Sequence, residues 1–458
     1  MEAEIVRNHA LISDAATRFV RYAVDDRRCL AKLQLLDDDM PEGFRNYQYA
    51  LHSWPWFVSP NTQERLARCV REIPRLLVKA LRLEFGKDHG KLARFFDVPD
   101  VLSVLFLESP IDTENMVQRT DAIYTERGLK ILELNIGSNI GGWQIHWLDR
   151  QYRKQPELAP FFADTPCETR NIPGEFMSFL IGAATRLQLQ ADRMVHVLFI
   201  VNPDDFDPSA AECIDLEFQQ ALRDCGQQGQ MHVATSFDDV TFKADQLYYR
   251  GRRIGVLCFS DFKLVTPPTQ LYRSAFANQV LWTENPLYRI VGDKRCLAIL
   301  FAHRSSPMFS EEERSVIEEF VPWSATFQAQ GVSFEGRRYD LADLLLREKD
   351  RFVVKHANGA QGNHVYVGKH TSRDNWSRVV EHALVHPEWV VQEYCPSLPF
   401  YGQCGEQGVA IFDVVWGIFG FGRCYGGSWL RLMEKGAGNG VVNSDKGAEE
   451  AIVYEAMD

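Results

Sequence analysis

The chain has 458 residues, a formal net charge of −12, and 45% hydrophobic and 24% charged residues, as in a globular protein of about two to four domains and unlike a disordered chain. The negative charge disfavours broad nucleic-acid binding, which needs a basic surface to neutralise phosphates. The ten cysteines form no C-x-x-C pair, so neither a zinc ribbon nor a disulfide framework is indicated. With no signal-peptide core at the N-terminus and no apolar run of the ~18–20 residues that span a bilayer, we expect a cytoplasmic protein without a membrane partner.

The first hundred residues are expected to be mainly helical. Over 61–86, apolar residues recur at helical spacing, which predicts a long amphipathic helix. Its predicted buried positions are Leu66, Val70, Ile73, Leu77 and Leu81. The aromatic-rich stretch 46–60 is interpreted as packing, and VLSVLFL (101–107) as a buried strand.

Residues 115–135 predict a hairpin of two strands joined by a turn that contains Gly128. With a three-residue loop, Thr125 pairs with Leu129. Asp121 then falls opposite Glu133, and Arg119 opposite Asn135. Because alternate residues of a strand share a face, these four polar side chains are expected on one face of the hairpin.

Two carboxylates on neighbouring strands repel each other unless a cation lies between them. Magnesium, which takes oxygen ligands and bridges substrate phosphates, suits Asp121, Glu133 and the amide of Asn135. The alternative is a solvated strand face with an incidental Arg119–Asp121 pair. The hairpin runs into a glycine-rich loop, GSNIGG (137–142), whose glycines permit close backbone approach to a ligand.

From residue 192, strand and helix segments alternate, which predicts a small α/β domain with a partly parallel sheet. Residues 286–350 are expected to be largely helical, with Ser310 capping a helix and Glu313 completing a capping box. Lys294 stands at the start of one of these helices.

The segment RFVVKHANGAQGNHVYVG (351–368) predicts a flexible hairpin in which Gly359 and Gly362 let backbone N–H groups approach an anion beside Lys355. It is no Walker A loop, and taken alone an ordinary hairpin explains it as well. Downstream, EWVVQEYC (388–395) is a strand ending in polar residues that could bind a flat heterocycle, and Arg431 precedes a glycine-rich turn.

As a set, R-x-D, E-x-N-x-G-S, G-D-K, V-K-x-x-x-G-x-x-G and V-Q-E-Y resemble the circularly permuted branch of the ATP-grasp superfamily, which includes glutathionylspermidine synthetase. The resemblance covers about residues 100–458, and the metal-binding D-x11-E-x-N segment comes first in the chain, as the permutation requires. It implies an α/β (α+β) ATP-grasp fold in permuted order. No amidase-like cysteine domain accompanies it, so no amidase activity is expected.

By position, the resemblance implies ATP and Mg²⁺ as cofactors and a role for each motif residue. The magnesium ligands would be Asp121, Glu133 and Asn135; the catalytic arginines Arg119 and Arg431; the nucleotide-binding residues Lys294, Lys355, Gly359, Gln361, Gly362, Gln392, Glu393 and Tyr394; and the substrate loop residues Ser138, Asn139 and Gly141.

The implied activity is ATP-dependent ligation of a carboxylate to an amine through an acyl phosphate, with a small-molecule or peptide acid and an amine acceptor as partners. A phosphotransferase and a non-catalytic nucleotide-binding protein are the alternatives. The implied organisation is a mainly helical region that is a candidate for substrate binding (1–110), a first core part (111–190), an inserted pre-ATP-grasp-like α/β domain (191–290), a nucleotide lid and hinge (291–395) and a second core part (396–458).

Overall fold

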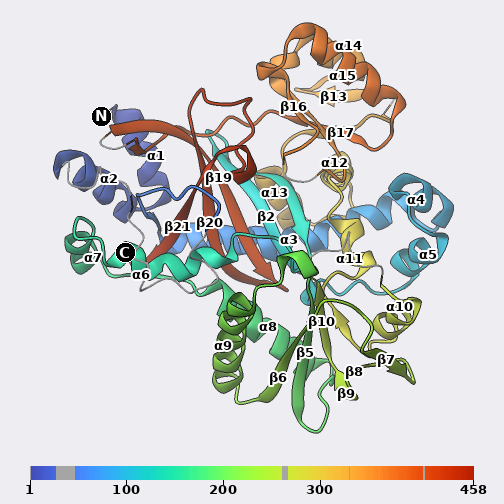
Figure 1. The fold of residues 1–458 in the computed structure, drawn as a ribbon. Coiled ribbons are helices and arrows are strands. Elements are labelled where there is room, and N and C mark those ends of the chain that lie inside the picture. The colour runs from blue at the N-terminus through green and yellow to red at the C-terminus, as the bar shows by residue number, and fades with distance from the viewer. Residues whose placement is uncertain are drawn as a thin grey trace.

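An eight-stranded sheet at the centre of the computed structural model joins strands from the two halves of the chain (Figure 1). The structure describes residues 2–26, 33, 47–259, 267–329, 331–359, 362–405 and 408–457. The sheet order is β1-β21-β20-β19-β2-β3, with β18 on β19 and β4 on β21. Its strands are β1 (Trp56–Val58), β2 (Val117–Thr125), β3 (Gly128–Ile136), β4 (Cys167–Thr169), β18 (Phe400–Cys404), β19 (Gly408–Phe421), β20 (Cys424–Glu434) and β21 (Glu449–Ala456).

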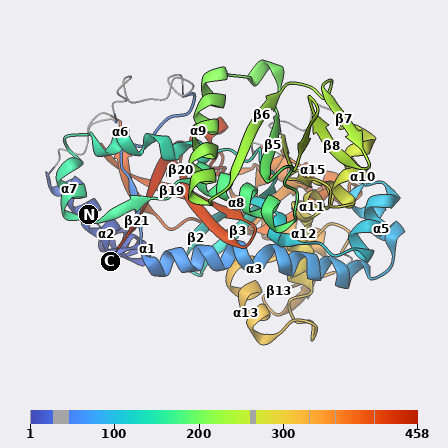
Figure 2. The ribbon, with the colours of Figure 1, turned by 90° about the horizontal axis from the view of Figure 1, so that it is seen from below.

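A long helix, α3 (Pro60–Phe85), runs across one face of this sheet (Figure 2). Ser59 caps its start by accepting from the Thr62 amide. All five apolar positions predicted to be buried are 0% exposed, so the predicted helix and its buried face are confirmed. On the opposite face, Phe419 and Trp429 of the sheet belong to a second apolar cluster with Ile140 and Ile172.

A four-stranded parallel sheet lies below the central sheet in Figure 1. Its order is β11-β10-β5-β6, and every neighbouring pair is parallel, which confirms the predicted small α/β unit. It comprises β5 (Met194–Ile200), β6 (Gln228–Ala234), β10 (Val256–Phe259) and β11 (Leu281–Trp282), flanked by α8 (Ile172–Arg186), α9 (Pro208–Asp224), α10 (Thr269–Phe276) and the meander β7 (Val240–Lys243), β8 (Gln246–Tyr249) and β9 (Arg252–Ile254).

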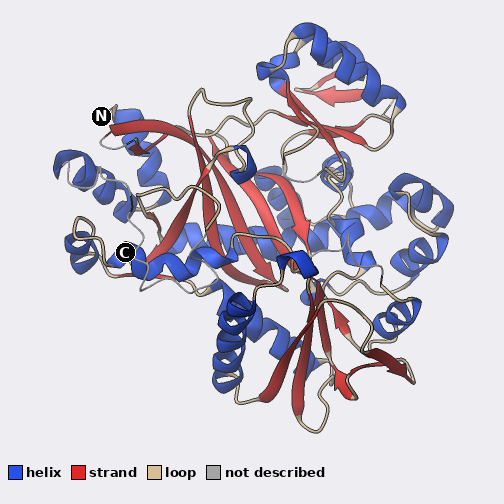
Figure 3. Cartoon of the chain, in the orientation of Figure 1, coloured by secondary structure: helices blue, strands red, loops and turns tan. Residues whose placement is uncertain are grey.

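A third, antiparallel sheet of order β12-β17-β15-β16 carries the predicted glycine hairpin (Figure 3, upper right). Buried side chains join it to α14 and α15 in one apolar cluster. This part of the chain comprises β12 (Ser324–Thr326), β13 (Val332–Phe334), β14 (Arg337–Tyr339), α14 (Leu341–Arg347), β15 (Phe352–His356), β16 (Val365–Val367), α15 (Arg373–Val385) and β17 (Trp389–Glu393). Strands β13 and β14 form a separate two-stranded sheet.

The remaining helices correct one prediction and confirm another. They are α1 (Ala3–Ile12), α2 (Asp14–Asp26), α4 (His89–Phe96), α5 (Asp100–Glu108), α6 (Asp149–Arg153), α7 (Ala159–Asp164), α11 (Pro286–Val291), α12 (Arg295–Ala302) and α13 (Glu311–Phe320). The strand predicted at 101–107 is wrong, because α5 buries Leu102 and Phe106 one helical turn apart while Val101 is 61% exposed. Ser310 and Glu313 form the predicted capping box of α13. Within the described residues no helix is both long and apolar enough to cross a membrane.

Candidate functional site

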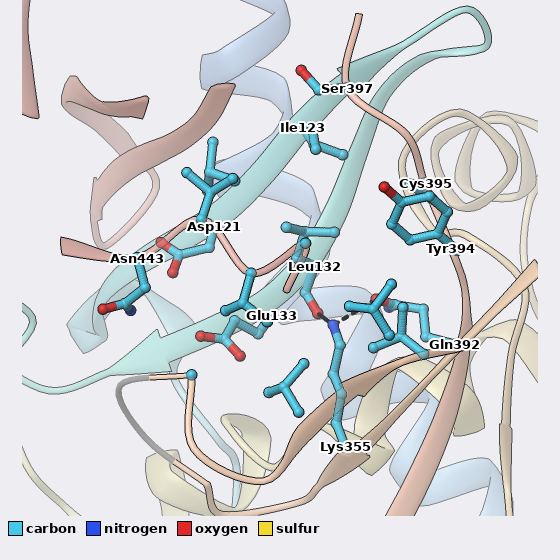
Figure 4. A pocket seen from close by; sticks show the side chains of 18 of the residues that line it. Asp121, Ile123, Leu132, Glu133, Lys355, Gln392, Tyr394, Cys395, Ser397 and Asn443 are labelled. Carbon is cyan, nitrogen blue, oxygen red and sulfur yellow. Dashed lines mark hydrogen bonds between the residues drawn. The ribbon is translucent and has the colours of Figure 1, made fainter. Parts of the chain in front are cut away.

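A cavity lies between the central sheet and the β15–β17 face of the third sheet (Figure 4). Strands β2, β3, β19 and β20 form one wall, and the glycine hairpin and the segment after β17 form the other. Figure 4 shows the carboxylates of Asp121 and Glu133 pointing from adjacent strands into the same part of the cavity, with Asn443 nearby. The lining thus combines the predicted acidic pair with residues from more than two hundred positions later in the chain.

The β2–β3 hairpin pairs Asp121 with Glu133 and Arg119 with Asn135, as predicted. Nevertheless, the predicted turn is wrong by one residue, because Thr125 pairs with Gly128, which has a φ of +86°. A register shift next to Asp121 leaves Leu132 unpaired and restores the predicted register at the site. Such a bulge bends the strand and re-aims the side chains beside it.

Two arginines hold the Asp121 carboxylate, which is 3% exposed. Arg119 donates from Nε to Oδ1 at 2.8 Å and from Nη2 to Oδ2 at 3.2 Å. Arg431 Nη2 lies 2.7 Å from Oδ2, and both guanidiniums stand over the Trp429 ring, 5.7 and 5.3 Å from its centroid. Burial alone would raise the pKa of Asp121, but the charges of Arg119 and Arg431 outweigh it and lower this pKa to about 2.

Replacing Asp121 by asparagine should therefore destabilise the protein. The substitution keeps the shape but leaves a buried guanidinium, that of Arg431, and a half-buried one, that of Arg119, without their counter-charge. Loss of one partner of a buried ion pair typically costs about 3–5 kcal/mol. We expect a clear fall in the urea midpoint monitored by tryptophan fluorescence. Asp97→Asn is the matched control, since Asp97 is exposed and its left-handed backbone tolerates asparagine. Equal midpoints for the two variants would contradict the expectation.

Lys294 links the acidic pair to the glycine hairpin. Its Nζ lies 3.3 Å from Glu133 Oε2 and donates to the Gly359 carbonyl at 2.6 Å. Lys294 is the N-cap residue of α12, so the predicted position at a helix start is confirmed. Gly359 and Gly362 both border the cavity, whereas Gln361 lies outside the described residues.

Lys355 crosses the cavity floor from β15 and is 7% exposed. Its Nζ donates to Gln392 Oε1 at 2.8 Å and to the Leu132 carbonyl at 3.3 Å, the second bond being made to the bulged residue of β3 (Figure 4). Burial lowers the pKa of Lys355 from 10.5 to about 8. A buried ammonium whose hydrogen-bond partners are neutral favours the binding of an anion, because a nearby negative charge raises the pKa of the ammonium and stabilises its protonated form.

The predicted heterocycle-binding segment, Gln392–Tyr394, borders the cavity, but two of its side chains are already engaged. Gln392 accepts from Lys355, and Glu393 Oε1 accepts from Arg127 at 2.7 Å. The nearby lining is apolar, with Ile123, Val353, Val367 and Val415 among its members. A flat ring bound here would therefore pack between aliphatic side chains.

The loop after β3 lies against Arg119 and outside the lining of this cavity. Arg119 Nη1 donates to the Gly141 carbonyl at 3.2 Å, and a Cβ at Gly142 would come within 2.2 Å of the Trp429 ring. Ser138 donates from its amide to buried Glu284 Oε1 at 2.7 Å, so this amide is already bonded to a protein carboxylate. Ser138 and Asn139 instead line a second cavity on the other side of the loop.

Sequence reasoning missed several residues of the site. Asp413, Asn443, Cys395 and Ser397 line the cavity, and Trp429 supports both arginines. Cys395 is the last residue of the predicted binding segment 388–395, and Asn443 lies in the glycine-rich run after Arg431. Asp413 and Trp429 lie within β19 and β20, and Ser397 follows β17. Their neighbours in the site are far away in the chain, and no local pattern marks them.

The oxygen atoms present fit a magnesium ion that is shared with a ligand. No group of three or more His, Cys, Asp or Glu side chains in the described part of the chain is arranged to hold a metal on its own. Asp121 and Glu133 line one cavity, and both Asp121 oxygens already accept from Arg119. Asn135 is outside the lining of this cavity and donates from Nδ2 to the Arg119 carbonyl at 3.3 Å. Magnesium usually takes one or two protein carboxylates and completes its shell with water and substrate phosphates.

Arg431, which lines the cavity, has a buried nitrogen that a bound ligand could satisfy. Among the described residues, Arg431 Nε has no hydrogen-bond partner, although Arg431 is 5% exposed. An unsatisfied buried donor costs about 1–3 kcal/mol unless a ligand or water completes it.

No protein-family model and no curated protein matches the sequence. A solved glutathione synthetase-like effector from Globodera pallida in its apo form has a TM-score of 0.58 and 12% identity, over 99% of this chain and 98% of that chain. A "Putative gamma-glutamylcysteine synthetase" from Methylobacillus flagellatus KT has a TM-score of 0.40 and 12% identity, over 83% of this chain and 87% of that one. The likeness to the effector extends along nearly the whole chain and, at this identity, shows a shared fold.

Proposed function

We propose that the protein is an ATP-dependent carboxylate–amine ligase with an ATP-grasp site in circularly permuted order. The observation that carries the proposal is the charge arrangement of the cavity. Asp121 and Glu133 face buried or half-buried cations from three other segments, namely Lys294, Lys355 and Arg431. The fold shared with a glutathione synthetase-like effector supports a ligase.

The nucleotide would lie along the cavity with its base at Gln392–Tyr394 and its phosphates at the lysines. Lys355 and Lys294 would neutralise the phosphates, and Asp121, Glu133 and Asn135 would hold magnesium. The bound ion would supply Lewis-acid stabilisation of the charge on the transferring phosphoryl group. The glycine hairpin between β15 and β16 would cover the phosphates and exclude water.

The chemistry requires two anions to approach each other. A substrate carboxylate oxygen attacks the γ-phosphorus, the bond to ADP breaks, and Arg119 and Arg431 would offset the charge that accumulates on the phosphoryl oxygens. The amine nitrogen then attacks the acyl carbon, and phosphate leaves as the amide forms. Because water competes with the amine for an acyl phosphate, exclusion of water by the hairpin is part of the proposed mechanism.

Hydroxylamine provides a test that needs no knowledge of the natural amine. A pool of carboxylic acids with Mg-ATP and hydroxylamine should release ADP and yield hydroxamates, which are identified by mass spectrometry. A phosphotransferase would release ADP with a stable phosphorylated product and no hydroxamate. A non-catalytic nucleotide-binding protein would gain thermal stability from Mg-ATP without releasing ADP, and either result would overturn the proposal.

Nucleotide binding should be accompanied by proton uptake at alkaline pH. The pKa of Lys355 is about 8 in the ligand-free protein against an ordinary 10.5, and bound phosphate should raise it. Between these values the unfolded chain binds more protons than the folded one at this site, so the contribution of Lys355 to the free energy of unfolding rises with pH in that window. At pH 8.5, which is above the pKa of Lys355 in the ligand-free protein, the protein should therefore take up a proton at Lys355 when Mg-ATP binds.

Calorimetric titration in two buffers of different ionisation enthalpy measures this uptake. Lys355→Met should abolish it, while Lys87→Met, which alters an exposed lysine, should not. Identical heats in both buffers for the unsubstituted protein would show that Lys355 does not meet the nucleotide.

A further inference from the structure

A second cavity lies where the parallel sheet meets the central sheet. It is formed by residues at the carboxyl ends of β5 and β10, by α8 and α9, by the 138–140 loop and by the end of β19. The cavity has a volume of about 150 Å³, below the ~300 Å³ at which sites for drug-sized ligands begin, so it suits a small apolar group. None of the described residues that line it is charged, and its walls are mostly aromatic and aliphatic, with Phe199, Val201, Phe419 and Phe421 among them.

This cavity lies on the same face of the central sheet as the candidate active site. Alternate residues of β2 share a face, so Asp121, Arg119 and Val117 follow one another in a row. Asp121 lines the first cavity and Val117 the second, which places them about 13 Å apart along the strand. Arg119 stands between the two.

The loop after β3 contacts Arg119 and also lines the apolar cavity. Ser138, Asn139 and Ile140 line the apolar cavity, and the next residue, Gly141, accepts from Arg119 at 3.2 Å. The same loop thus contacts Arg119 with one residue and lines the apolar cavity with the three residues before it.

Buried Glu284 makes the loop side of the cavity a fixed wall. Its Oε1 accepts from the Ser138 amide at 2.7 Å, and its Oε2 accepts from the Phe259 amide at 3.0 Å and from Thr283 Oγ1 at 2.7 Å. These bonds tie the loop to the ends of β10 and β11.

We propose that this cavity receives the uncharged, apolar body of the carboxylic acid substrate, whose carboxylate is held at Arg119. The inference rests on the proposed ligase function and deepens it by naming the substrate class: aliphatic or aromatic monocarboxylic acids rather than acids with a charged or strongly polar body. Burial of apolar surface would provide the affinity and Arg119 the orientation.

A homologous series of straight-chain acids tests the substrate class. With Mg-ATP and hydroxylamine, the acid oxygen takes the γ-phosphoryl group, the hydroxylamine nitrogen displaces phosphate, and one ADP and one phosphate are released per hydroxamate. From butanoate to octanoate, the KM should fall about fourfold per methylene, the ratio that corresponds to about 0.8 kcal/mol. A KM that stays flat along the series, or hydroxamates formed only from polar acids such as glutamate, would overturn the inference while leaving the ligase proposal intact.

Direct binding separates the two proposals. In calorimetry with a non-hydrolysable ATP analogue, octanoate should bind at least about tenfold more tightly than octanamide, which lacks the charge that Arg119 recognises. Absence of octanoate binding would overturn the apolar cavity as a substrate site. Binding of octanoate without hydroxamate formation would instead overturn the ligase proposal.

Substitutions in the cavity wall complete the test. Phe199→Asp places a charge in the lining and should raise the KM for octanoate at least about tenfold, with little change in the KM for ATP. Phe206→Asp is the control, because Phe206 is 42% exposed and outside the cavity lining. If Phe199→Asp does not fold, the milder Ile214→Asn on α9 should still raise the KM for octanoate, and an unchanged KM in a folded cavity variant would contradict the inference.

Discussion

Replacement of Glu133 by alanine is expected to lower turnover about a thousandfold while the affinity for ATP changes little. Glu133 would be a ligand of magnesium, and loss of such a ligand removes several kcal/mol of transition-state charge stabilisation. The adenine contacts and Lys355 remain. Among the described residues Glu133 forms one ion pair, at 3.3 Å from Lys294. Its removal should therefore disturb the fold less than removal of Asp121.

The measurement is ADP release as a function of magnesium concentration, together with nucleotide binding by calorimetry. The Glu133 variant should need a higher magnesium concentration for half-maximal binding of nucleotide, a readout that is independent of turnover. Glu126→Ala, at the exposed tip of the same hairpin, is the matched control and should behave as the unsubstituted protein. Turnover close to normal in the Glu133 variant would show that the acidic pair has no role in catalysis and only forms part of a solvated strand face.

The second large effect is expected for Arg119→Lys, which keeps the charge but removes the planar pair of donors. In the ligand-free protein Arg119 uses three nitrogens, two on Asp121 and one on the Gly141 carbonyl. An ammonium cannot hold a carboxylate or an acyl phosphate in this bidentate way. Turnover should fall about a hundred- to a thousandfold, the cost of losing one preorganised donor to a developing anion.

The position of Arg119 also predicts how the kinetic constants divide. The KM for the acid should rise, and the KM for ATP should stay within about twofold, because the nucleotide would lie on the far side of Asp121. Arg127→Lys, an exposed arginine at the hairpin tip paired with Glu393, is the control. An equal rise in both Michaelis constants would indicate that Arg119 binds nucleotide instead of acid.

Local patterns were sufficient to predict many of the elements that position the site. The alternation on β2 and β3 predicted that Asp121 faces Glu133, and the helical periodicity of 61–86 predicted the buried face of α3. Both features depend on neighbours along the chain or across one turn. The same reasoning failed for 101–107, because a short apolar run has no period of its own and its neighbours decide which face is buried.

Other features depend on contacts between distant segments and left no local trace. The pairing of Arg431 with Asp121 joins β20 to β2 across 310 positions. The role of Glu284 as the anchor of Ser138 joins residues 146 positions apart, and a lone buried glutamate has no signature in the sequence. The apolar cavity has walls from seven segments of the chain, and no one of them indicates a cavity when it is considered alone.

Because of the bulge at Leu132, the pairing of Asp121 with Glu133 does not depend on the number of residues in the hairpin tip. The residues at the tip pair in a register that is shifted by one residue from the register at the site. The unpaired residue of the bulge compensates for this shift before Glu133. A tip one residue longer or shorter could therefore coexist with the same carboxylate pair, provided that the bulge changes with it. Homologues that have drifted in this way would carry ten or twelve residues between the aspartate and the glutamate, and a search that demands the eleven found here would pass over them.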